Sequence, residues 1–309
     1  MTTRPALVQS ESISLRARAQ GAYLGLAVGD ALGATVEFMT PREIAQQYGE
    51  HREIVGGGWL HLKSGQVTDD TTMSLALGEA ILAHGIEACA IAQAFDDWMR
   101  AKPVDIGNTV RRGILHFRQS GQALCQESEY DAGNGACMRT LPIALATLGA
   151  SYEQVCWAVQ QQAHVTHHNA LSDAGTLCVT RMVQMALQGS SLAAILHGPV
   201  QQLLTQFPVF TFRNKRPVEN PSGYIVDTLR CVFEVFFDTD NFEDCLVETV
   251  NRGGDADTTG AIVGMIAGAY YGEDAIPARW LNRLDDLIER QCRQQAVALL
   301  DCNPSHGES

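Results

Sequence analysis

The sequence predicts an all-α protein with a single multi-helix domain over residues 13–300 and a two-metal site at the end of its helical core. Three observations support this fold class. Apolar residues recur at helical spacing along most of the chain, strand-like alternation is rare, and a hydrophobic content of 46% over 309 residues suffices for a sizeable core. No Gly/Ser linker interrupts the pattern, and we expect only the ends, 1–12 and 301–309, to be flexible.

Glycine stands at every fourth position of two helical segments, one that begins near Ile13 and one at 259–272. The glycines are Gly21, Gly25, Gly29 and Gly33 in the first segment and Gly260, Gly264, Gly268 and Gly272 in the second. This spacing places each set on one helix face. Because a glycine costs about 1 kcal/mol inside a helix, a close approach of another backbone is the natural reason for it. We infer that both helices are buried and pack together, although two unrelated core helices explain the pattern about as well.

The other helices follow from apolar periodicity and from glycine stops such as Gly85. We predict them at 70–85, 89–100, 106–119, 136–148, 151–163, 170–187, 191–206, 223–237, 241–251 and 283–300. A short extended piece is expected within 56–66, and the stretches 120–135 and 207–222 are expected to be irregular.

The composition restricts the classes of partner. The formal net charge is -13 with no basic stripe, so a nucleic-acid groove is not expected and a divalent cation is a natural partner. The nine cysteines form no C-x-x-C pair, which favours reduced thiols over a disulfide framework. The N-terminal segment lacks the apolar region of a signal peptide, and no apolar run is long enough to span a bilayer. We therefore expect a soluble, cytoplasmic protein without an integral membrane segment.

Two oxygen-rich segments, TDDTT at 68–72 and DADTT at 255–259, each precede an apolar helix. Taken singly, each fits an ordinary helix cap, because Thr and Asp are preferred at helix N-termini. Together they hold four aspartates, which would repel one another in space unless cations lay between them. Carboxylate and hydroxyl oxygens select Mg²⁺, Mn²⁺ or Ca²⁺. Four carboxylates would balance two divalent cations.

Two further acids stand in settings that suggest chemistry. Glu37 follows the first glycine-lined helix between Val36 and Phe38, where an apolar environment would raise its pKa and suit it to proton transfer. A solvent-facing glutamate is the simpler interpretation. Asp105 lies in KPVDIGNT, which fits a substrate loop or, equally well, an N-cap for the helix that starts near Ile106.

Two glycine-containing loops precede predicted helices. One contains Gly133, Asn134 and Gly135, and the other, DIGNT, contains Asn108. Backbone N–H groups at such points can hold a phosphate without lysine. Both are also ordinary turn sequences.

A histidine cluster and one tyrosine complete the candidates. His164, His167 and His168 are spaced so that two of them can share a helix face, which fits metal ligation or a ligand contact by one histidine. Tyr224 could stack on a base or sugar, or belong to the core.

The order of the motifs is itself informative. In chain order they read GAYLGLAVGDALGATVEF, TDDTTMSLALG, PVDIGNT, DAGNGACMR, VTHHNALSDA and NRGGDADTTGAIVGMIAGAYYG. This series resembles the ADP-ribosylglycohydrolase family over about residues 20 to 300. The stretches GDALGATVEFMT and YIVDT favour its bacterial, nitrogenase-linked subgroup.

The resemblance implies an all-α fold with a binuclear manganese or magnesium centre. The family's metal ligands fall on Thr68, Asp69, Asp70, Asp255, Asp257 and Thr258, and its ADP-ribose contacts on Asn108, Gly133, Asn134, Gly135, His167 and Tyr224. Glu37 matches a glutamate near the metals and Asp105 a proposed acid/base residue, and the two are not ranked as the catalytic acid/base. This chain has two histidines where the family motif has one, and we choose His167 over His168 because it follows Thr166 directly.

The resemblance also implies an activity: hydrolysis of the bond between ADP-ribose and an arginine of a modified protein, with dinitrogenase reductase as the target. It further implies control by a PII signalling protein and reversible membrane association through a partner, and we expect a monomer. Three alternatives stay open: another ADP-ribosyl linkage, a non-catalytic ADP-ribose-binding regulator, and a dimetal phosphohydrolase. The last is disfavoured because neither histidine ligands nor a basic phosphate clamp is evident.

Overall fold

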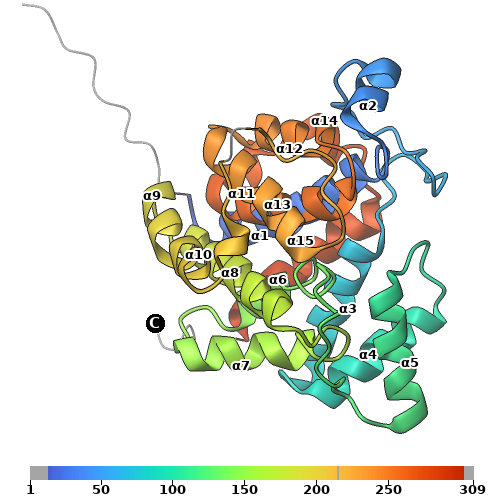
Figure 1. The fold of residues 1–309 in the computed structure, drawn as a ribbon, viewed down its shortest axis with the longest axis vertical. Coiled ribbons are helices and arrows are strands. Elements are labelled where there is room, and N and C mark those ends of the chain that lie inside the picture. The colour runs from blue at the N-terminus through green and yellow to red at the C-terminus, as the bar shows by residue number, and fades with distance from the viewer. Residues whose placement is uncertain (1–12, 214–215, 303–309) are drawn as a thin grey trace, which may run out of the picture.

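Two glycine-lined helices, α1 (Leu15–Gly33) and α13 (Ala256–Tyr271), lie side by side through the middle of the molecule (Figure 1). The facing pairs are Gly21 with Gly268, Gly25 with Gly264, Gly29 with Gly260, and Gly33 with Ala256. The pairing order makes the helices antiparallel. A Cβ on Gly260 would lie 2.5 Å from the Gly29 carbonyl oxygen, a distance that no side chain tolerates. The prediction that these helices pack together is therefore confirmed.

The computed structural model describes residues 13–213 and 216–302, so the predicted flexible segment 1–12 and most of 301–309 lie outside the described part. Around α1 and α13 the chain forms α2 (Pro41–Tyr48), α3 (Asp69–His84), α4 (Ala88–Arg100), α5 (Asn108–Ser120), α6 (Leu141–Ala146), α7 (Tyr152–Ala163), α8 (Ala170–Leu187), α9 (Leu192–Ile195), α10 (Gln201–Gln206), α11 (Ile225–Asp238), α12 (Phe242–Asn251), α14 (Ala278–Leu281) and α15 (Asp286–Asp301). Short non-α turns are η1 (Leu196–Val200), η2 (Pro208–Phe210) and η3 (Glu273–Ala275).

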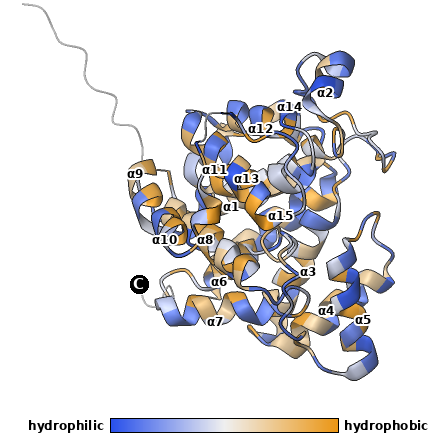
Figure 2. Cartoon of the chain, viewed as in Figure 1, coloured by the Kyte–Doolittle hydropathy of each residue, from blue (hydrophilic) through white to orange (hydrophobic). Residues whose placement is uncertain are grey.

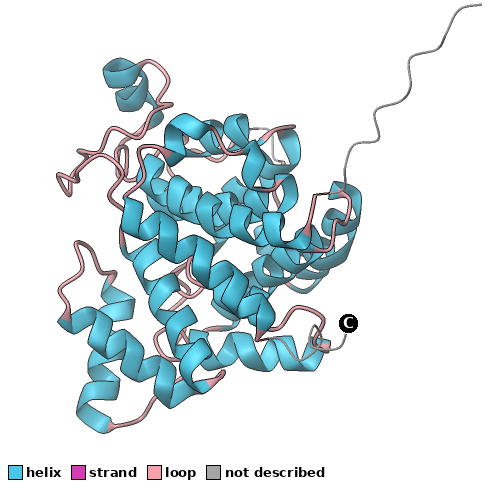
Figure 3. Ribbon diagram, turned by 180° about the vertical axis from the view of Figure 1, so that it is seen from behind, coloured by secondary structure: helices cyan, strands magenta, loops and turns pink. Residues whose placement is uncertain are grey.

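The all-α prediction is confirmed. Figure 3 shows helices joined by loops, and no strand is present among the described residues. Over 13–213 and 216–302, β-type backbone pairing is limited to two isolated bridges, Gly57 with Leu62 and Gly133 with Tyr224. The extended piece expected within 56–66 is thus reduced to a single bridge.

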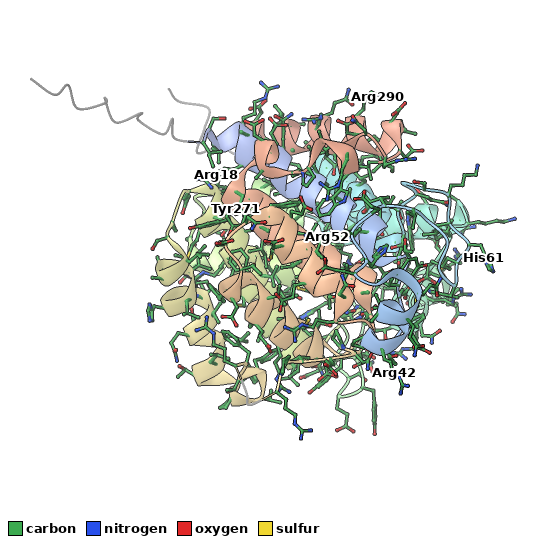
Figure 4. All side chains as sticks on the ribbon, turned by 90° about the horizontal axis from the view of Figure 1, so that it is seen from above. Arg18, Arg42, Arg52, His61, Tyr271 and Arg290 are labelled. Carbon is green, nitrogen blue, oxygen red and sulfur yellow. The ribbon has the colours of Figure 1, made fainter. Side chains whose placement is uncertain are left out.

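The apolar side chains face the centre of the bundle. All residues of α1 from Gly21 to Gly33 and of α13 from Ala256 to Ala269 are buried, whereas α2 and α5 at the periphery carry many hydrophilic residues (Figure 2). At the end of the pair remote from Gly33, Arg18 donates to the Ala269 carbonyl oxygen at 2.9 Å, and Figure 4 shows Arg18 near Tyr271 there. This cation satisfies a terminal carbonyl of α13 and complements its dipole.

Three of the differences between the predicted and the observed helices have local reasons. The segment 191–206 is broken at η1, where Gly198 leaves helical geometry at φ -89° and ψ -106° and is followed by Pro199. The segment 136–148 is helical only in α6, since turns precede Pro142 at the helix start. Helix α2 was not predicted although Thr40 and Glu43 form a capping box at its start.

Within the described chain every helix is too short or too polar to cross a bilayer. All nine cysteines are free, as the cysteine pattern predicts.

Candidate metal and substrate site

The two oxygen-rich segments meet where α3 and α13 begin. The hydroxyl of Thr258 donates to Oδ2 of Asp70 at 3.4 Å, a contact between residues 188 positions apart. The hydroxyl of Thr68 donates to the same oxygen at 3.1 Å. Asp70 and Thr258 are buried, and the pairing inferred from the sequence therefore exists in the structure.

Helix capping does not account for most of these acids, although Oδ1 of Asp257 accepts from the backbone N–H of Thr258 at 2.8 Å in the first turn of α13. The N-cap residues of α3 and α13, Thr68 and Asp255, make no side-chain cap hydrogen bond. Instead Asp30 of α1 caps α3 from outside: its carboxylate accepts from the backbone N–H of Thr68 at 3.0 Å and of Thr71 at 3.1 Å, and from both hydroxyls. Asp69 and Asp70 are thus left for another purpose. Asp30 was missed in the sequence, although a lone acid in a buried apolar helix is a detectable signal.

The glycines before Asp255 turn the chain sharply into the site. Gly253 and Gly254 have φ of 70° and 65°, a region that favours glycine. The Gly254 carbonyl oxygen accepts from Phe38 N–H at 2.7 Å, which ties this turn to the end of α1. The neighbouring cation, Arg252, pairs with Glu248 at 2.6 Å, so it does not neutralise the aspartates.

Ionisation of the acids in the resulting cluster is strongly disfavoured. Carboxylate oxygens of Glu37, Asp255 and Asp257 lie within 4.8 Å of one another. Glu37 is only 5% exposed, so the solvent-facing interpretation is wrong. Burial and then the charges of Asp255 and Asp105 raise the pKa of Glu37 to about 8, despite a 2.6 Å hydrogen bond from the indole of Trp59. Burial and neighbouring carboxylates raise the pKa of Asp69 to about 7.

The donor set fits a hard divalent cation. Oδ1 of Asp70 is buried and has no hydrogen-bond partner among the described residues. Burial raises the pKa values of Asp70 and Asp257 well above the usual range, and nearby carboxylates add to this, Asp30 first at Asp70 and Glu37 first at Asp257. A bound cation would remove both penalties, because it supplies the positive charge that the ionised oxygens lack.

A cavity of about 280 Å³ opens onto this cluster. Its lining is Glu37, Phe38, Asp69, Asp105, Gly107, Asn108, Thr109, Val110, Gly133, Asn134, Gly135, Met138, His167, Gly223, Asp255, Asp257 and Thr258. The cavity thus gathers most of the residues proposed from the sequence, which come from six separate stretches of chain. No lysine or arginine is among its lining residues.

Asp105 lies free at the side of the cavity. The N-cap of α5 is Gly107, so the N-cap interpretation of Asp105 is wrong. Asp105 is half-buried and, within the described part of the chain, makes no hydrogen bond or ion pair. Its carboxylate is therefore available to a ligand.

The Gly133–Gly135 loop combines support with binding capacity. The amide of Asn134 donates to Asp255 Oδ2 at 2.6 Å and to the Thr228 hydroxyl at 2.9 Å, so this side chain positions a cluster carboxylate. The N–H of Asn134 is occupied by the Gly223 carbonyl at 3.0 Å. The N–H groups of Gly133 and Gly135 have no acceptor among the described residues, which leaves two donors for an anion.

His167 is held by a buried chain of hydrogen bonds. Arg139 donates to the Thr166 hydroxyl oxygen at 2.8 Å, and that oxygen lies 2.8 Å from Nδ1 of His167. When Thr166 donates its own hydrogen to Nδ1, the His167 proton resides on Nε2, which faces the Gly133–Gly135 loop. Burial, with the charge of Arg139 next, lowers the pKa of His167 to about 3, so the ring is neutral.

The other aromatic candidates lie outside the cavity. His168 stacks on His164 at 3.7 Å and bonds the Cys125 carbonyl at 2.9 Å. Tyr224 is 38% exposed, so it is not a core residue, and its backbone pairs with Gly133 at the cavity edge.

Comparisons with known proteins find relatives that match nearly the whole chain. The chain is 52% identical over 288 residues to the ADP-ribosyl-[dinitrogen reductase] glycohydrolase of Rhodospirillum rubrum, covering 93% of this chain and 97% of that protein. It is 32% identical to the ADP-ribosylarginine hydrolase Tri1 of Serratia proteamaculans, covering 92% and 79%. A solved structure described as an ADP-ribosylglycohydrolase-related protein complex matches with a TM-score of 0.81 at 32% identity, over 94% of this chain and 99% of that one.

The sequence model of the ADP-ribosylglycohydrolase family matches residues 11–306, nearly the whole chain. With the helical fold and the acidic cavity in place, the protein belongs to the ADP-ribosylglycohydrolase family.

Proposed function

We propose that the protein is a metal-dependent glycosidic hydrolase that removes ADP-ribose from an ADP-ribosylated arginine of a target protein. The observation that carries this proposal is one cavity that combines the largely buried carboxylate cluster, which includes Glu37, with a further acid, Asp105. The name of the relative from Serratia proteamaculans supports the arginine linkage, and that of the Rhodospirillum rubrum relative supports removal of ADP-ribose from a protein.

Two divalent cations, Mn²⁺ or else Mg²⁺, are the proposed cofactors. Their ligands would be Thr68, Asp69, Asp70, Asp255, Asp257 and Thr258, with Glu37 close enough to contribute an oxygen. When bound, such cations orient the ribose hydroxyls and a water and stabilise developing negative charge.

The reaction replaces a carbon–nitrogen bond by a carbon–oxygen bond. Water oxygen bonds to C1″ of the ribose as the bond from C1″ to the guanidine nitrogen breaks, and the leaving nitrogen takes up a proton. Glu37 and Asp105 face the cavity together, so one can protonate the leaving nitrogen while the other accepts the proton of the water. Trp59 fixes the Glu37 carboxylate through its indole N–H.

The ADP-ribose itself would be held at the other end of the cavity. Gly133 and Gly135 offer free N–H groups for the pyrophosphate, and neutral His167 offers a further donor. Asn108 lines the same cavity at the start of α5, and Tyr224 would stack at its edge. Asn134 would act mainly through Asp255.

The proposed target is ADP-ribosylated dinitrogenase reductase, whose release from modification would restore its activity. This follows from the name of the Rhodospirillum rubrum relative. We further propose that a PII signalling protein controls the activity and that the protein is a monomer. Its proposed location is cytoplasmic, with reversible membrane association through a partner.

A linkage panel tests this function. The purified protein is incubated with arginine-linked, serine-linked and O-acetyl-ADP-ribose substrates, with Mn²⁺ or with chelator, and released ADP-ribose is measured. We expect turnover of the arginine linkage with Mn²⁺ and none with chelator. Tight ADP-ribose binding without turnover of any substrate would instead identify a regulator, and preference for another linkage would reassign the substrate.

A further inference from the structure

Two exposed aromatic side chains pack against each other beside the cavity, and one of them, Phe38, is part of its lining. Phe38 is 64% exposed and Trp59 49% exposed, and their ring centroids are 5.5 Å apart with a tilt of 47°. They come from separate loops that follow α1. Figure 4 shows His61, on the same loop as Trp59, at the outer edge of the molecule. Large apolar side chains in such a position need a reason, because exposure forfeits the stabilisation that burial provides.

The backbone holds Phe38 in this position against its own preference. Phe38 has φ of 62°, in the left-handed region that side chains other than glycine rarely adopt. Its N–H donates to the Gly254 carbonyl oxygen at 2.7 Å, and the Gly254 N–H donates to the Met39 carbonyl oxygen at 3.0 Å. The turn that presents Asp255 therefore also fixes Phe38, whose side chain lines the cavity.

Trp59 connects the aromatic pair to the chemistry. Its indole N–H donates to Oε2 of Glu37 at 2.6 Å, and Glu37 lies within the carboxylate cluster. The pair thus stands one hydrogen bond from an acid that the proposed function places at the bond to be broken. With Glu37 as the acid that protonates the leaving nitrogen, the substrate atoms next to the pair would be those of the group leaving C1″.

The chemistry of the place selects a planar cation. Aromatic faces attract guanidinium groups, which stack on them and bond carboxylates at their edges. Glu37 and Asp105 supply such carboxylates, and the cavity lining has no lysine or arginine to repel a cation. We propose that Phe38 and Trp59 form a subsite for the guanidinium of the ADP-ribosylated arginine. This proposal rests on the proposed function and adds a determinant of linkage specificity.

The adenosine end of the substrate would not compete for this subsite. Asp255 links two parts of the site through its contacts: Asn134 of the Gly133–Gly135 loop donates to its carboxylate, and a carboxylate oxygen of Glu37 lies within 4.8 Å of it. The free loop N–H groups and His167 adjoin Asn134, whereas the aromatic pair adjoins Glu37.

The test compares linkages in Phe38 variants. We expect Phe38→Leu, which keeps an apolar side chain but removes the ring, to lower kcat/KM for the arginine linkage by about 3- to 30-fold. Phe38→Tyr should restore it. Free ADP-ribose affinity and any turnover of serine-linked substrate should stay unchanged. Trp157→Leu, which removes a 50% exposed aromatic on α7 outside the cavity lining, is the matched control.

Three outcomes would overturn the subsite. These are an unchanged kcat/KM in Phe38→Leu, an equal loss for every linkage, and a parallel loss of ADP-ribose affinity, which would assign the pair to the nucleotide. Failure of the proposed function is seen separately, as absence of arginine-linked turnover by the wild-type protein. In that event the subsite is tested by calorimetric titration with agmatine, a guanidinium compound, in the presence of ADP-ribose. Phe38→Leu should weaken agmatine binding by about 3- to 30-fold, and unchanged binding would overturn the subsite.

Discussion

Asp255 is the carboxylate on which most interactions of the site converge. It accepts from Asn134, and its oxygens lie close to Glu37 and Asp257. Asp255→Asn keeps the shape but removes the charge that attracts a cation. We expect Mn²⁺ affinity, measured by calorimetry, to fall at least about tenfold. Asp274→Asn, at an exposed acid, should bind as the wild type does. Equal Mn²⁺ affinity in the two variants would remove Asp255 from the ligand set.

Thr166 is a positioning residue between Arg139 and His167. Thr166→Val keeps the side-chain volume but removes the hydroxyl that bonds both neighbours. We expect ADP-ribose affinity to fall by about 1 kcal/mol, roughly fivefold, because the His167 proton is no longer held on Nε2. Thr166→Ser should restore it. The ¹⁵N shifts of the imidazole report the tautomer directly, and an unchanged Nε2–H signature in Thr166→Val would contradict this role.

At the scale of elements, the glycine faces set how deeply α1 and α13 seat against each other. The Gly260 position meets backbone atoms of Gly29, which cannot move aside as a flexible side chain would. We expect Gly260→Ala to lower the free energy of unfolding by about 3 kcal/mol, the upper range for overpacking, measured by urea denaturation. Gly107→Ala, whose Cβ meets only a Val110 methyl at 3.9 Å, should cost less than about 1 kcal/mol. Equal urea midpoints would show that the helices separate without penalty.

The same elements show what a sequence can and cannot predict. Periodicity identified the long helices because their buried faces carry apolar residues at helical spacing. It failed at Gly198, where the backbone leaves helical geometry although the spacing of the apolar residues continues. The motifs identified Asp69 and Asp255 because the cluster repeats one residue type at two helix starts. The partners of Asp30 and Trp59 lie 38 and 22 positions away, so no local pattern predicts these contacts, although the lone acid in the first glycine-lined helix was itself a visible signal.

At the scale of the whole molecule, the buried acids of the cavity lower the stability of the helical fold that holds them together. Asp30, Glu37 and Asp69 are buried acids held among other carboxylates. The closely packed α1 and α13 fix the segments that carry Asp30 and Asp257, so the cluster cannot relax by spreading apart. The cost of charging these groups is therefore borne by the stability of the fold unless cations are bound.

The raised pKa values of these acids predict how the stability of the metal-free protein depends on pH. Burial raises the pKa of Asp30 to about 6, of Asp69 to about 7 and of Glu37 to about 8, from ordinary values of 3.8, 3.8 and 4.5. Between the ordinary and the raised values the folded state holds more protons than the unfolded state. Because the folded state must give up more protons, the free energy of unfolding falls as the pH rises through this window. Each unit of pKa difference corresponds to about 1.4 kcal/mol. We expect the Tm in chelator to decrease from about pH 5 to pH 8.

Saturating Mn²⁺ should reverse the slope, because cations compete with protons for the same oxygens and bind more tightly as the carboxylates ionise. The two Tm curves, measured by calorimetry with and without Mn²⁺, should then diverge with rising pH. Asp255→Asn should lessen the divergence, and Asp274→Asn should leave it unchanged. Parallel curves would mean that the buried carboxylates are not where the cation binds, and that the charge of the cavity is balanced in some other way.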